Sequence, residues 1–288
     1  MKVTLINLFA CPGCRGTLLP LIIKKTKERV LEADLKCEKC GKRFHIEEGI
    51  AYFISPLKKQ TARERRELRK TTLRQEIFKT WIRLFSKQEL VALKKEWKWM
   101  LSAVKKEKGT IHLDFAAGTG RFLRNIIPKT KGEIIALDYG YSTCLELQYF
   151  LRKIKKYNRV SIVCADARKM PFKDEVFDSI TTWHGLDEVK MEESLKETRR
   201  ILKNRAYFVA SGLHYQQGSK SFLIAKKEHI QFMTKEAIIE ALRKSGFRKI
   251  QHKTFFRGRW NEKESYLPIF GDFYSTYAIK AKKLKSHN

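Results

Sequence analysis

The stretch from residue 111 to residue 123 reads IHLDFAAGTGRFL, and it constrains the fold more than any other part of the chain. An apolar run, 111–115, leads into small residues and glycines and then directly into the apolar-periodic segment 122–127. This order predicts a strand, a tight turn and a helix. Gly118 and Gly120 carry no Cβ, so the backbone can bend sharply there and a ligand can come close. The free N–H groups at the start of the following helix favour a ligand in the turn.

From residue 111 onward, apolar runs alternate with helix-like segments, which is typical of a parallel sheet covered by helices. The second apolar run, 133–138, ends in Asp138, about 20 residues after the glycines. A carboxylate at that place can accept hydrogen bonds from both ribose hydroxyls of a nucleoside. We expect further strands at 161–165, from 177 and at 206–211, with helices at 195–202 and 235–244, the last of them capped by Thr234.

A specific pattern follows the third expected strand: Asp166–Ala167, then Met170–Phe172, then Phe177–Asp178. In this order the residues resemble the signature of class I S-adenosylmethionine-dependent methyltransferases, particularly the branch that includes enzymes of ubiquinone and menaquinone biosynthesis. The resemblance begins at about residue 111 and runs to the end of the chain. It implies an α/β fold with a Rossmann-like methyltransferase sheet and S-adenosylmethionine as cofactor. A hydride-transferring Rossmann enzyme is the structural rival, but the pattern after Asp166 has no role in it.

The resemblance also implies roles for single residues. Asp114 and the turn 116–120 would cradle the methionine part of the cofactor, and Asp138 would hold the ribose. Asp166 would bind the adenine amino group, with Ala167 beside the ring. The complete set of expected cofactor contacts is Asp114, Ala116, Gly118, Thr119, Gly120, Asp138, Tyr139, Asp166, Ala167 and Trp183.

Two positions depart from the family pattern. Ala116 replaces the usual first glycine, and a small Cβ is compatible with the turn if φ is negative there. Gly140 stands where a serine often follows the acidic residue, which leaves the start of the next helix open.

The residues after the fourth strand are expected to face the acceptor. His184 is the candidate catalytic residue, as a general base or as a hydrogen-bond partner of the acceptor. Trp183 or Trp260 would stack against a base. The alternative is that His184 and Trp183 only form a wall of the cofactor pocket.

Two C-x-x-C pairs occur near the N-terminus. Four thiolates close a tetrahedral site with no open position, which favours structural rather than catalytic zinc. Two disulfides or free thiols are the alternative, and a cytosolic setting disfavours disulfides. The expected ligands are Cys11, Cys14, Cys37 and Cys40, whereas Cys144 and Cys164 are interpreted as packing residues.

Residues 43–54 look like a hairpin that closes a zinc ribbon. The first 55 or so residues resemble the small zinc-ribbon activator subunits of methyltransferases. They are also similar to the N-terminal domain of bacterial large-subunit rRNA guanine-N1 methyltransferases. In those families a proline usually follows the Gly-Ile pair, and here Ala51 stands in its place.

The charge balance is strongly basic, with 61 Lys and Arg against 31 Asp and Glu and a net charge of +30. This excess indicates a polyanionic partner such as nucleic acid or an anionic membrane surface. A lysine-rich proteome bias is the alternative. Residues 58–108 are expected to form two amphipathic helices, and the basic face of the first would contact RNA. A lysine-rich tail adds Lys280, Lys282, Lys283 and Lys285.

These patterns divide the chain into a zinc ribbon (1–56), a basic helical connector (57–108) and a methyltransferase domain (109–288). No apolar run approaches the ~18 residues of a membrane span, and residues 1–10 are interpreted as a first strand rather than a signal peptide. We therefore expect a cytoplasmic, zinc-containing methyltransferase that acts on rRNA or tRNA, with a base nitrogen as acceptor.

An acceptor of another class is the alternative: a small molecule or a quinone or lipid, with the ribbon as an interaction module for a protein partner. Such an acceptor predicts an apolar groove near residues 255–273. Residues 212–232 would form part of the acceptor pocket in either case.

Overall fold

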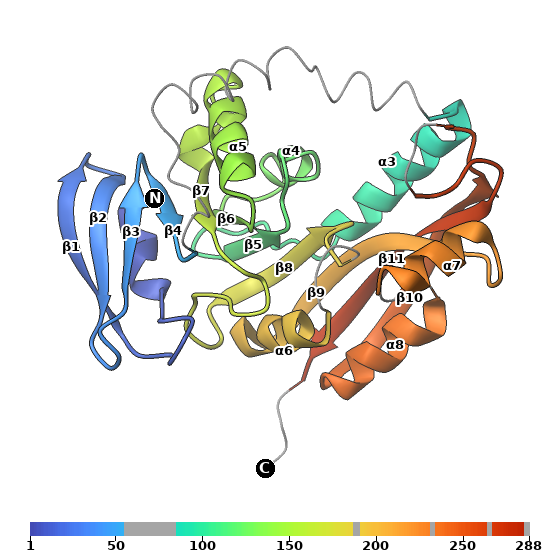
Figure 1. Ribbon diagram of the computed structural model, residues 1–288. Helices are drawn as coiled ribbons and strands as arrows, with labels where there is room; N and C mark the ends of the chain where they lie inside the picture. Colours follow the sequence, from blue (N-terminus) through green and yellow to red (C-terminus); the bar gives the residue numbers. More distant parts are fainter. Residues whose placement is uncertain (55–84, 187–190, 231–233, 264–266, 285–288) are drawn as a thin grey trace.

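The computed structural model describes residues 1–54, 85–186, 191–230, 234–263 and 267–284. Within these residues the strands form one sheet in the order β1-β2-β3-β4-β7-β6-β5-β8-β9-β11-β10 (Figure 1). The strands are β1 (Leu18–Lys25), β2 (Val30–Cys37), β3 (Arg43–Glu47), β4 (Ile50–Tyr52), β5 (Ile111–Phe115), β6 (Glu133–Asp138), β7 (Val160–Cys164), β8 (Phe177–Trp183), β9 (Leu202–Tyr215), β10 (Phe247–Arg259) and β11 (Phe273–Lys283).

The centre of the sheet is parallel. Strands β7, β6, β5, β8 and β9 pair in parallel, whereas β11 runs antiparallel to both of its neighbours, β9 and β10. The order of the first five is the 3-2-1-4-5 order of a doubly wound α/β sheet, which places ligands at the carboxyl ends of the strands. The expected Rossmann-like methyltransferase fold is confirmed.

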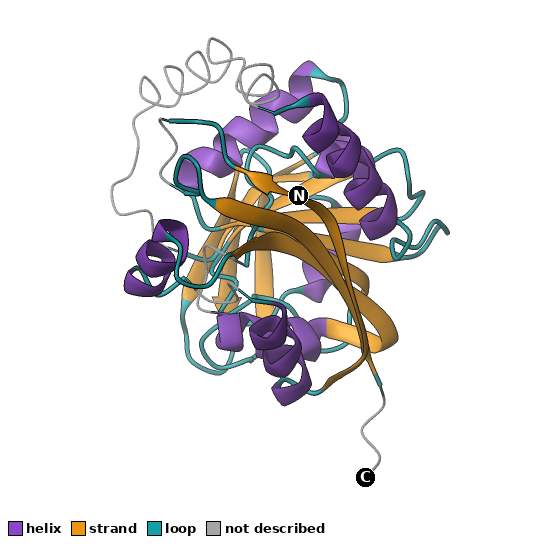
Figure 2. Cartoon of the chain, turned by 90° about the vertical axis from the view of Figure 1, so that its right-hand side faces the viewer, coloured by secondary structure: helices purple, strands orange, loops and turns teal. Residues whose placement is uncertain are grey.

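Helices cover both faces of the sheet (Figure 2). Side chains alternate between faces along a strand. In β6, Ile134 and Ala136 therefore pack on one side, and Ile135 and Leu137 pack on the other. The first face carries α3 (Lys87–Leu101), α4 (Leu123–Ile126) and α5 (Tyr141–Lys153), and the second carries α6 (Met191–Ile201), α8 (Lys235–Lys244) and the 3-10 helix η1 (Val3–Leu8). The remaining helices are α7 (Lys220–Lys227) and the short η2 (Tyr157–Arg159).

The N-terminal hairpins extend the same sheet. β4 is fully buried and pairs in parallel with β7, so that Ile50, Ala51 and Tyr52 lie opposite Ile162, Val163 and Cys164. Without β4, the buried strand β7 would have an edge of unpaired backbone N–H and C=O groups. The ribbon expected at residues 1–56 therefore contributes a strand to the methyltransferase sheet.

The second connector helix begins where its sequence provides a cap. Ser86 Oγ accepts a hydrogen bond from Glu89 N, and Glu89 Oε2 accepts one from Ser86 N, which together form a capping box at the start of α3. The helix then packs on β10 and β11. The first expected connector helix, with its basic face for RNA, lies outside the described residues.

Two sequence-based predictions are wrong. Residues 1–10 do not form a strand: residues 3–8 form the 3-10 helix η1, which buries the adjacent Leu5 and Ile6 against the sheet. An extended strand would place two adjacent side chains on opposite faces.

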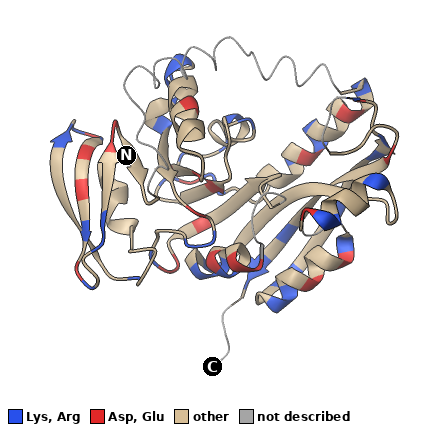
Figure 3. Ribbon diagram, in the orientation of Figure 1, with Lys and Arg blue, Asp and Glu red and all other residues tan. Residues whose placement is uncertain are grey.

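The second wrong prediction concerns part of the lysine-rich tail, because three of its four lysines lie within β11 and two of these are buried (Figure 3). Lys283 is buried and donates to Leu202 O at 2.7 Å. Lys280 is buried too, with its Nζ 3.9 Å from the centre of the Trp99 ring. These two cations stabilise the sheet, and because they are buried they cannot bind a polyanion. Lys285 lies outside the described residues.

None of the helices in the described parts of the chain combines the length and the apolar character that a membrane crossing requires.

We expect the N-terminal strands and the central sheet to unfold together. Leu35 in β2 is 1% exposed, and Leu35→Ala should lower the free energy of unfolding by about 3 kcal/mol. All five tryptophans lie after residue 80, outside β1–β4, so urea unfolding followed by tryptophan fluorescence reports the rest of the chain. Leu21→Ala is the matched control, since Leu21 is 66% exposed. An unchanged fluorescence midpoint for Leu35→Ala would show that the N-terminal strands unfold separately.

Candidate functional site

A cavity of about 800 Å³ opens beside the carboxyl ends of β5, β6 and β8 and beneath α3. One side is formed by the turn after β5, the end of β6 and the end of β8. The other side is formed by α3 and the residue Phe85 before it, by residues of β9, β10 and β11, and by the connection between β10 and β11. The lining residues are Phe85, Glu89, Leu93, Glu96, Ala116, Ala117, Gly118, Thr119, Arg121, Asp138, Thr143, Trp183, His184, Gly185, Leu213, Phe256, Trp260, Glu262, Leu267, Pro268, Tyr274 and Thr276.

The turn after β5 is bound to the carboxylate of Asp138. Gly118 N donates to Asp138 Oδ2 at 2.8 Å, and Gly140 N donates to Oδ1 at 2.9 Å. This carboxylate thus ties the turn after β5 to the turn after β6. A Cβ at Gly118 would meet no atom within 4 Å, so this side of the turn is open to a ligand.

The backbone of the turn is left-handed at three of its residues. Gly118 and Gly120 have φ values of 55° and 83°, which glycine adopts without strain. Ala116 has a φ of 49°, and the negative φ expected there is therefore wrong. The Cβ of Ala116 is accommodated because its neighbour across the turn is Gly185, where an added Cβ would lie 2.4 Å from it.

The structure brings six of the predicted site residues to the cavity: Ala116, Gly118, Thr119, Asp138, Trp183 and His184. The other five predicted residues are not part of its lining. Gly120 lies behind the turn, where a Cβ would be 2.7 Å from Leu147 Cδ1. Tyr139 is exposed and Ala167 is buried outside the cavity.

Asp114 is buried behind the turn rather than facing the cavity. Its Oδ1 accepts a hydrogen bond from Thr181 Oγ1 at 2.6 Å, and that hydroxyl lies 3.1 Å from the buried His112 Nε2. Burial raises the pKa of Asp114 to about 7, although the bond from Thr181 opposes this. Asp114 therefore joins β5 to β8 through a buried polar chain.

Asp166 forms an ion pair with Arg168 beyond the cavity lining. Arg168 Nη2 lies 2.6 Å from Asp166 Oδ2, and Arg168 Nε donates to both carboxylate oxygens at 2.9 Å. Partial burial alone would raise the pKa of Asp166, but these bonds hold the pKa below its ordinary value. Any ligand that binds Asp166 must compete with this ion pair.

Sequence reasoning missed Glu96, which enters the cavity from α3. Glu96 is 1% exposed, and its Oε1 accepts a hydrogen bond from Trp183 Nε1 at 3.1 Å. Burial raises the pKa of Glu96 to about 7, while His184 and the bond from Trp183 act in the opposite direction. The i, i+4 spacing of Ala92, Glu96 and Met100 in the sequence places them on one helical face. The structure shows that this face is the buried one.

The cavity has the opposite charge to the chain as a whole. Four carboxylates line it, whereas Arg121 is the only Lys or Arg among its described lining residues. The net charge of the chain is +30. Because an enclosed cluster of carboxylates repels anions, the cavity favours neutral or cationic ligands over phosphates.

The aromatic side chains of the cavity are packed against one another. Tyr274 lies 5.5 Å, centroid to centroid, from both Trp260 and Phe256, and Phe85 lies 6.0 Å from Trp260. Such a wall buries a flat apolar ring with little loss of side-chain freedom.

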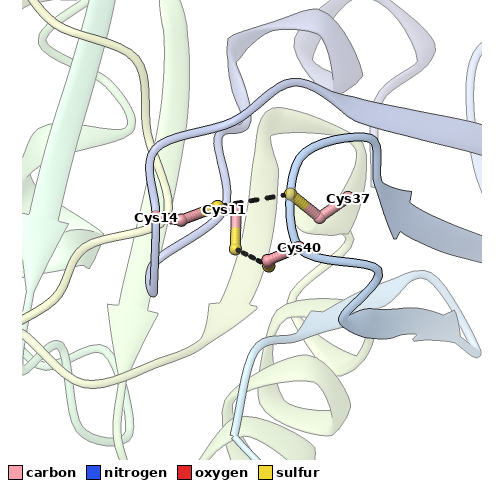
Figure 4. A group of neighbouring side chains, drawn as sticks. All are labelled: Cys11, Cys14, Cys37 and Cys40. Carbon is pink, nitrogen blue, oxygen red and sulfur yellow. Dashed lines mark hydrogen bonds between the residues drawn. The ribbon is translucent and has the colours of Figure 1, made fainter.

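The four predicted metal ligands converge from the loop before β1 and from the end of β2 with the turn that follows it (Figure 4). Their sulfur atoms all lie within 4.8 Å of one another. Cys14 Sγ is 3.4 Å from Cys37 Sγ, and Cys11 Sγ is 3.7 Å from Cys40 Sγ. Two thiolates on a tetrahedral Zn²⁺ stand about 3.8 Å apart, whereas a disulfide needs about 2.05 Å. This set of donors fits Zn²⁺.

The first metal-binding loop also contacts the central sheet. Arg15, which follows Cys14, pairs with the buried Glu197 of α6 at 2.5 Å and donates to Met170 O at 3.0 Å. Glu197 Oε2 in turn accepts from Met170 N at 2.9 Å. The loop that follows Asp166 is therefore fixed by a residue that lies between two metal-ligand positions.

Comparison with known families agrees with this geometry, because residues 113–210 match the family model of the methyltransferase domain. The middle of the chain is a methyltransferase domain. Its match includes the turn after β5, Asp138 and His184, but neither the N-terminal strands nor α3.

Curated relatives are similar to the chain over part of their length. A demethylmenaquinone methyltransferase of Staphylococcus saprophyticus is 32% identical over 114 residues, which are 38% of this chain and 47% of the relative. The ubiquinone/menaquinone biosynthesis C-methyltransferase UbiE of Photorhabdus laumondii is 36% identical over 101 residues, 33% of this chain and 39% of the relative. The chain thus spans less than half the length of these relatives.

Solved structures share the fold at low identity. Phosphoethanolamine N-methyltransferase 2 of Haemonchus contortus aligns with a TM-score of 0.52 and 18% identity, over 66% of this chain and 53% of the other. Geranyl diphosphate C-methyltransferase of Streptomyces coelicolor aligns with a TM-score of 0.54 and 10% identity, over 66% and 76%. The [4+2]-cyclase SpnF also aligns, with a TM-score of 0.54 and 16% identity, over 65% and 80%. The fold alone therefore does not determine the reaction.

We expect the purified protein to contain one zinc ion per chain, measured by atomic absorption. Cys14→Ser should lose most of the metal, because three thiolates bind Zn²⁺ far less tightly than four. Cys144→Ser is the control, because Cys144 is buried in α5 away from the cluster. Wild-type protein without zinc, when prepared under metal-replete conditions, would rule out the zinc interpretation.

The contribution of Asp114 to stability should fall as the pH rises from about 5 to 7. The folded chain keeps Asp114 protonated up to a pKa of about 7, whereas the unfolded chain releases the proton near the model value of 3.8. Between these values the folded state binds the extra proton, so rising pH favours unfolding by up to ~1.4 kcal/mol per pH unit. Asp114→Asn should flatten this slope in urea titrations at several pH values. A slope identical to wild type would contradict the assignment.

Proposed function

We propose that this protein transfers a methyl group from S-adenosylmethionine to a small, neutral acceptor with an aromatic ring, such as a quinol. The observation that supports this most is the lining of the acceptor side of the cavity, which combines an aromatic wall with carboxylates. The curated relatives, which are named as quinone methyltransferases, support an acceptor of the same class. We infer further that Zn²⁺ binds the four cysteines and holds the N-terminal strands in register.

The cofactor would occupy the side of the cavity formed by the turns after β5 and β6. The open face of Gly118 leaves room beside the backbone, and Asp138 is in position to accept hydrogen bonds from ribose hydroxyls. When bound, S-adenosylmethionine supplies an electrophilic methyl group. The protein then contributes mainly by aligning the acceptor and excluding water.

The acceptor would lie between α3 and the wall formed by Phe256, Trp260 and Tyr274. Trp183, at the end of β8, is fixed by its bond to Glu96 and also lines the cavity. The direction of an apolar ring is thus set by packing, and no charged group of the acceptor has to be paired with a lysine or arginine.

RNA, the acceptor expected from the charge, is the second candidate. The net charge of +30 still favours a polyanionic partner. However, Lys280 and Lys283 are buried, and the phosphate groups of a polynucleotide would meet four carboxylates at the cavity. A quinol-type acceptor therefore agrees better with the described residues than a base of rRNA or tRNA does.

Methyl transfer from tritium-labelled S-adenosylmethionine should discriminate the two acceptors. We expect label in reduced demethylmenaquinone with a short isoprenoid chain, and none in bulk rRNA or tRNA. Trp260→Ala should raise KM for the quinol at least tenfold without changing the affinity for S-adenosylmethionine, because it removes part of the aromatic wall. Label in RNA alone would overturn the proposal and favour the second candidate.

Cofactor binding can be tested separately by calorimetry. Asp138→Ala should weaken binding of S-adenosylmethionine at least tenfold, because both the ribose acceptor and the anchor of the turn are lost. Asp174→Ala is the control, since this carboxylate is exposed and is not among the residues that line the cavity. Unchanged affinity in Asp138→Ala would refute the role given to Asp138.

A further inference from the structure

Glu96 is held in a place where a glutamate side chain is unfavourable. The capping box fixes where α3 begins, and Ala92, Glu96 and Met100 then fall on the face that packs against the sheet. Glu96 is 1% exposed. A buried carboxyl group costs free energy unless it is fully bonded, so its presence needs a reason.

The bonds of Glu96 use only part of its capacity. Oε1 accepts from Trp183 Nε1, whereas Oε2 makes no hydrogen bond of normal geometry among the described residues, although the nearby side chains of Ser211 and Thr276 favour the charged form of Glu96. Glu96 is one of the lining residues of the cavity, so a ligand there would lie beside a buried carboxyl group that has one unbonded oxygen.

In two other carboxylates of the cavity, each oxygen already accepts a hydrogen bond from the protein. Glu89 accepts from the Tyr274 hydroxyl and from Ser86 N. Asp138 accepts from Gly118 N and Gly140 N. Glu262, the fourth, is only half-buried. Among the cavity carboxylates, Glu96 is therefore the one that combines full burial with an orphaned oxygen.

We propose that Glu96 is the catalytic base, which accepts through Oε2 the proton that the acceptor loses when it is methylated. This inference rests on the proposed function. As the nucleophilic atom of the acceptor bonds to the methyl carbon, the methyl–sulfur bond breaks and its electron pair stays on sulfur. The acceptor releases one proton, which passes to the Glu96 carboxylate and from there to water.

The surroundings of Glu96 suit this role. The titratable groups that line the same cavity are Glu89, Asp138, Glu262 and His184, together with Arg121. Burial raises the pKa of Glu96 to about 7, and His184 favours the charged form. A base with a pKa near the working pH is both ionised often enough and basic enough to take a proton. His184, the residue expected from the sequence, would then support the charge of Glu96.

The kinetic test is Glu96→Gln with the quinol acceptor named above. The amide keeps the bond from Trp183 but cannot take a proton, so kcat should fall by about 10²–10⁴-fold, while the affinity for S-adenosylmethionine changes less than twofold. Wild-type kcat should rise with pH and level off above a midpoint near 7, and the variant should lose this rise. Glu240→Gln is the matched control, since Glu240 is 64% exposed on α8 and pairs with Lys244. Glu96→Gln with kcat within threefold of wild type and an unchanged pH profile would overturn the proposal.

A second measurement needs no acceptor. In infrared difference spectra, the band of a protonated carboxyl group that is missing from Glu96→Gln should disappear from the wild type between pH 5 and pH 9. A band that persists to pH 9 would mean that Glu96 never ionises, and the proposal would fail. If the wild type methylates RNA but not the quinol, the proposed acceptor is wrong, and the kinetic test of Glu96 is then made with RNA.

Discussion

The buried edge of β7 is the constraint on which the N-terminal half of the molecule depends. Every residue of β7 is buried, so its outer row of backbone groups must be bonded to protein. β4 supplies those bonds, and β4 is only three residues long. A strand so short cannot hold its register alone, and the antiparallel β1–β3 and the cysteine cluster fix it in place. Arg15 adds a second attachment, through Glu197, to the loop after β7. The ribbon thus completes the sheet that carries the cavity.

The cavity depends in turn on elements from outside the matched domain. Residues 113–210 provide the turns around Asp138 and the end of β8, but the opposite wall comes from α3, β10 and β11. The family match does not extend to α3, β10 or β11. A fold found in an N-methyltransferase, a C-methyltransferase and a cyclase leaves the reaction and the acceptor open. In this chain the opposite wall is aromatic and acidic.

Local chemistry made much of this structure predictable. The apolar runs and glycines of 111–123 predicted β5 and its turn, and Thr234 marked the start of α8 correctly. Predictions failed where the conformation or burial of a residue depends on a partner that is distant in the sequence. The Cβ of Ala116, which has a positive φ, has space because Gly185 lies opposite. Lys283 is buried because Glu175 and Leu202 O receive its charge. Glu96 was not predicted as a site residue because a glutamate in a lysine-rich helix is ordinarily exposed to solvent. Its burial depends on Trp183, which is 87 positions away in the sequence.

The pairing of β4 with β7 has a consequence for the order of events during synthesis. The cysteines and β1–β4 leave the ribosome first, but β7 follows only after more than a hundred further residues. During this interval the edge of β4 has no partner, and an unpaired edge is a site of non-native association. A metal ion bound early would hold the N-terminal hairpins in their final conformation until β7 has been synthesised. In the nascent chain, zinc would then act as a folding aid that keeps β4 ready to pair with β7.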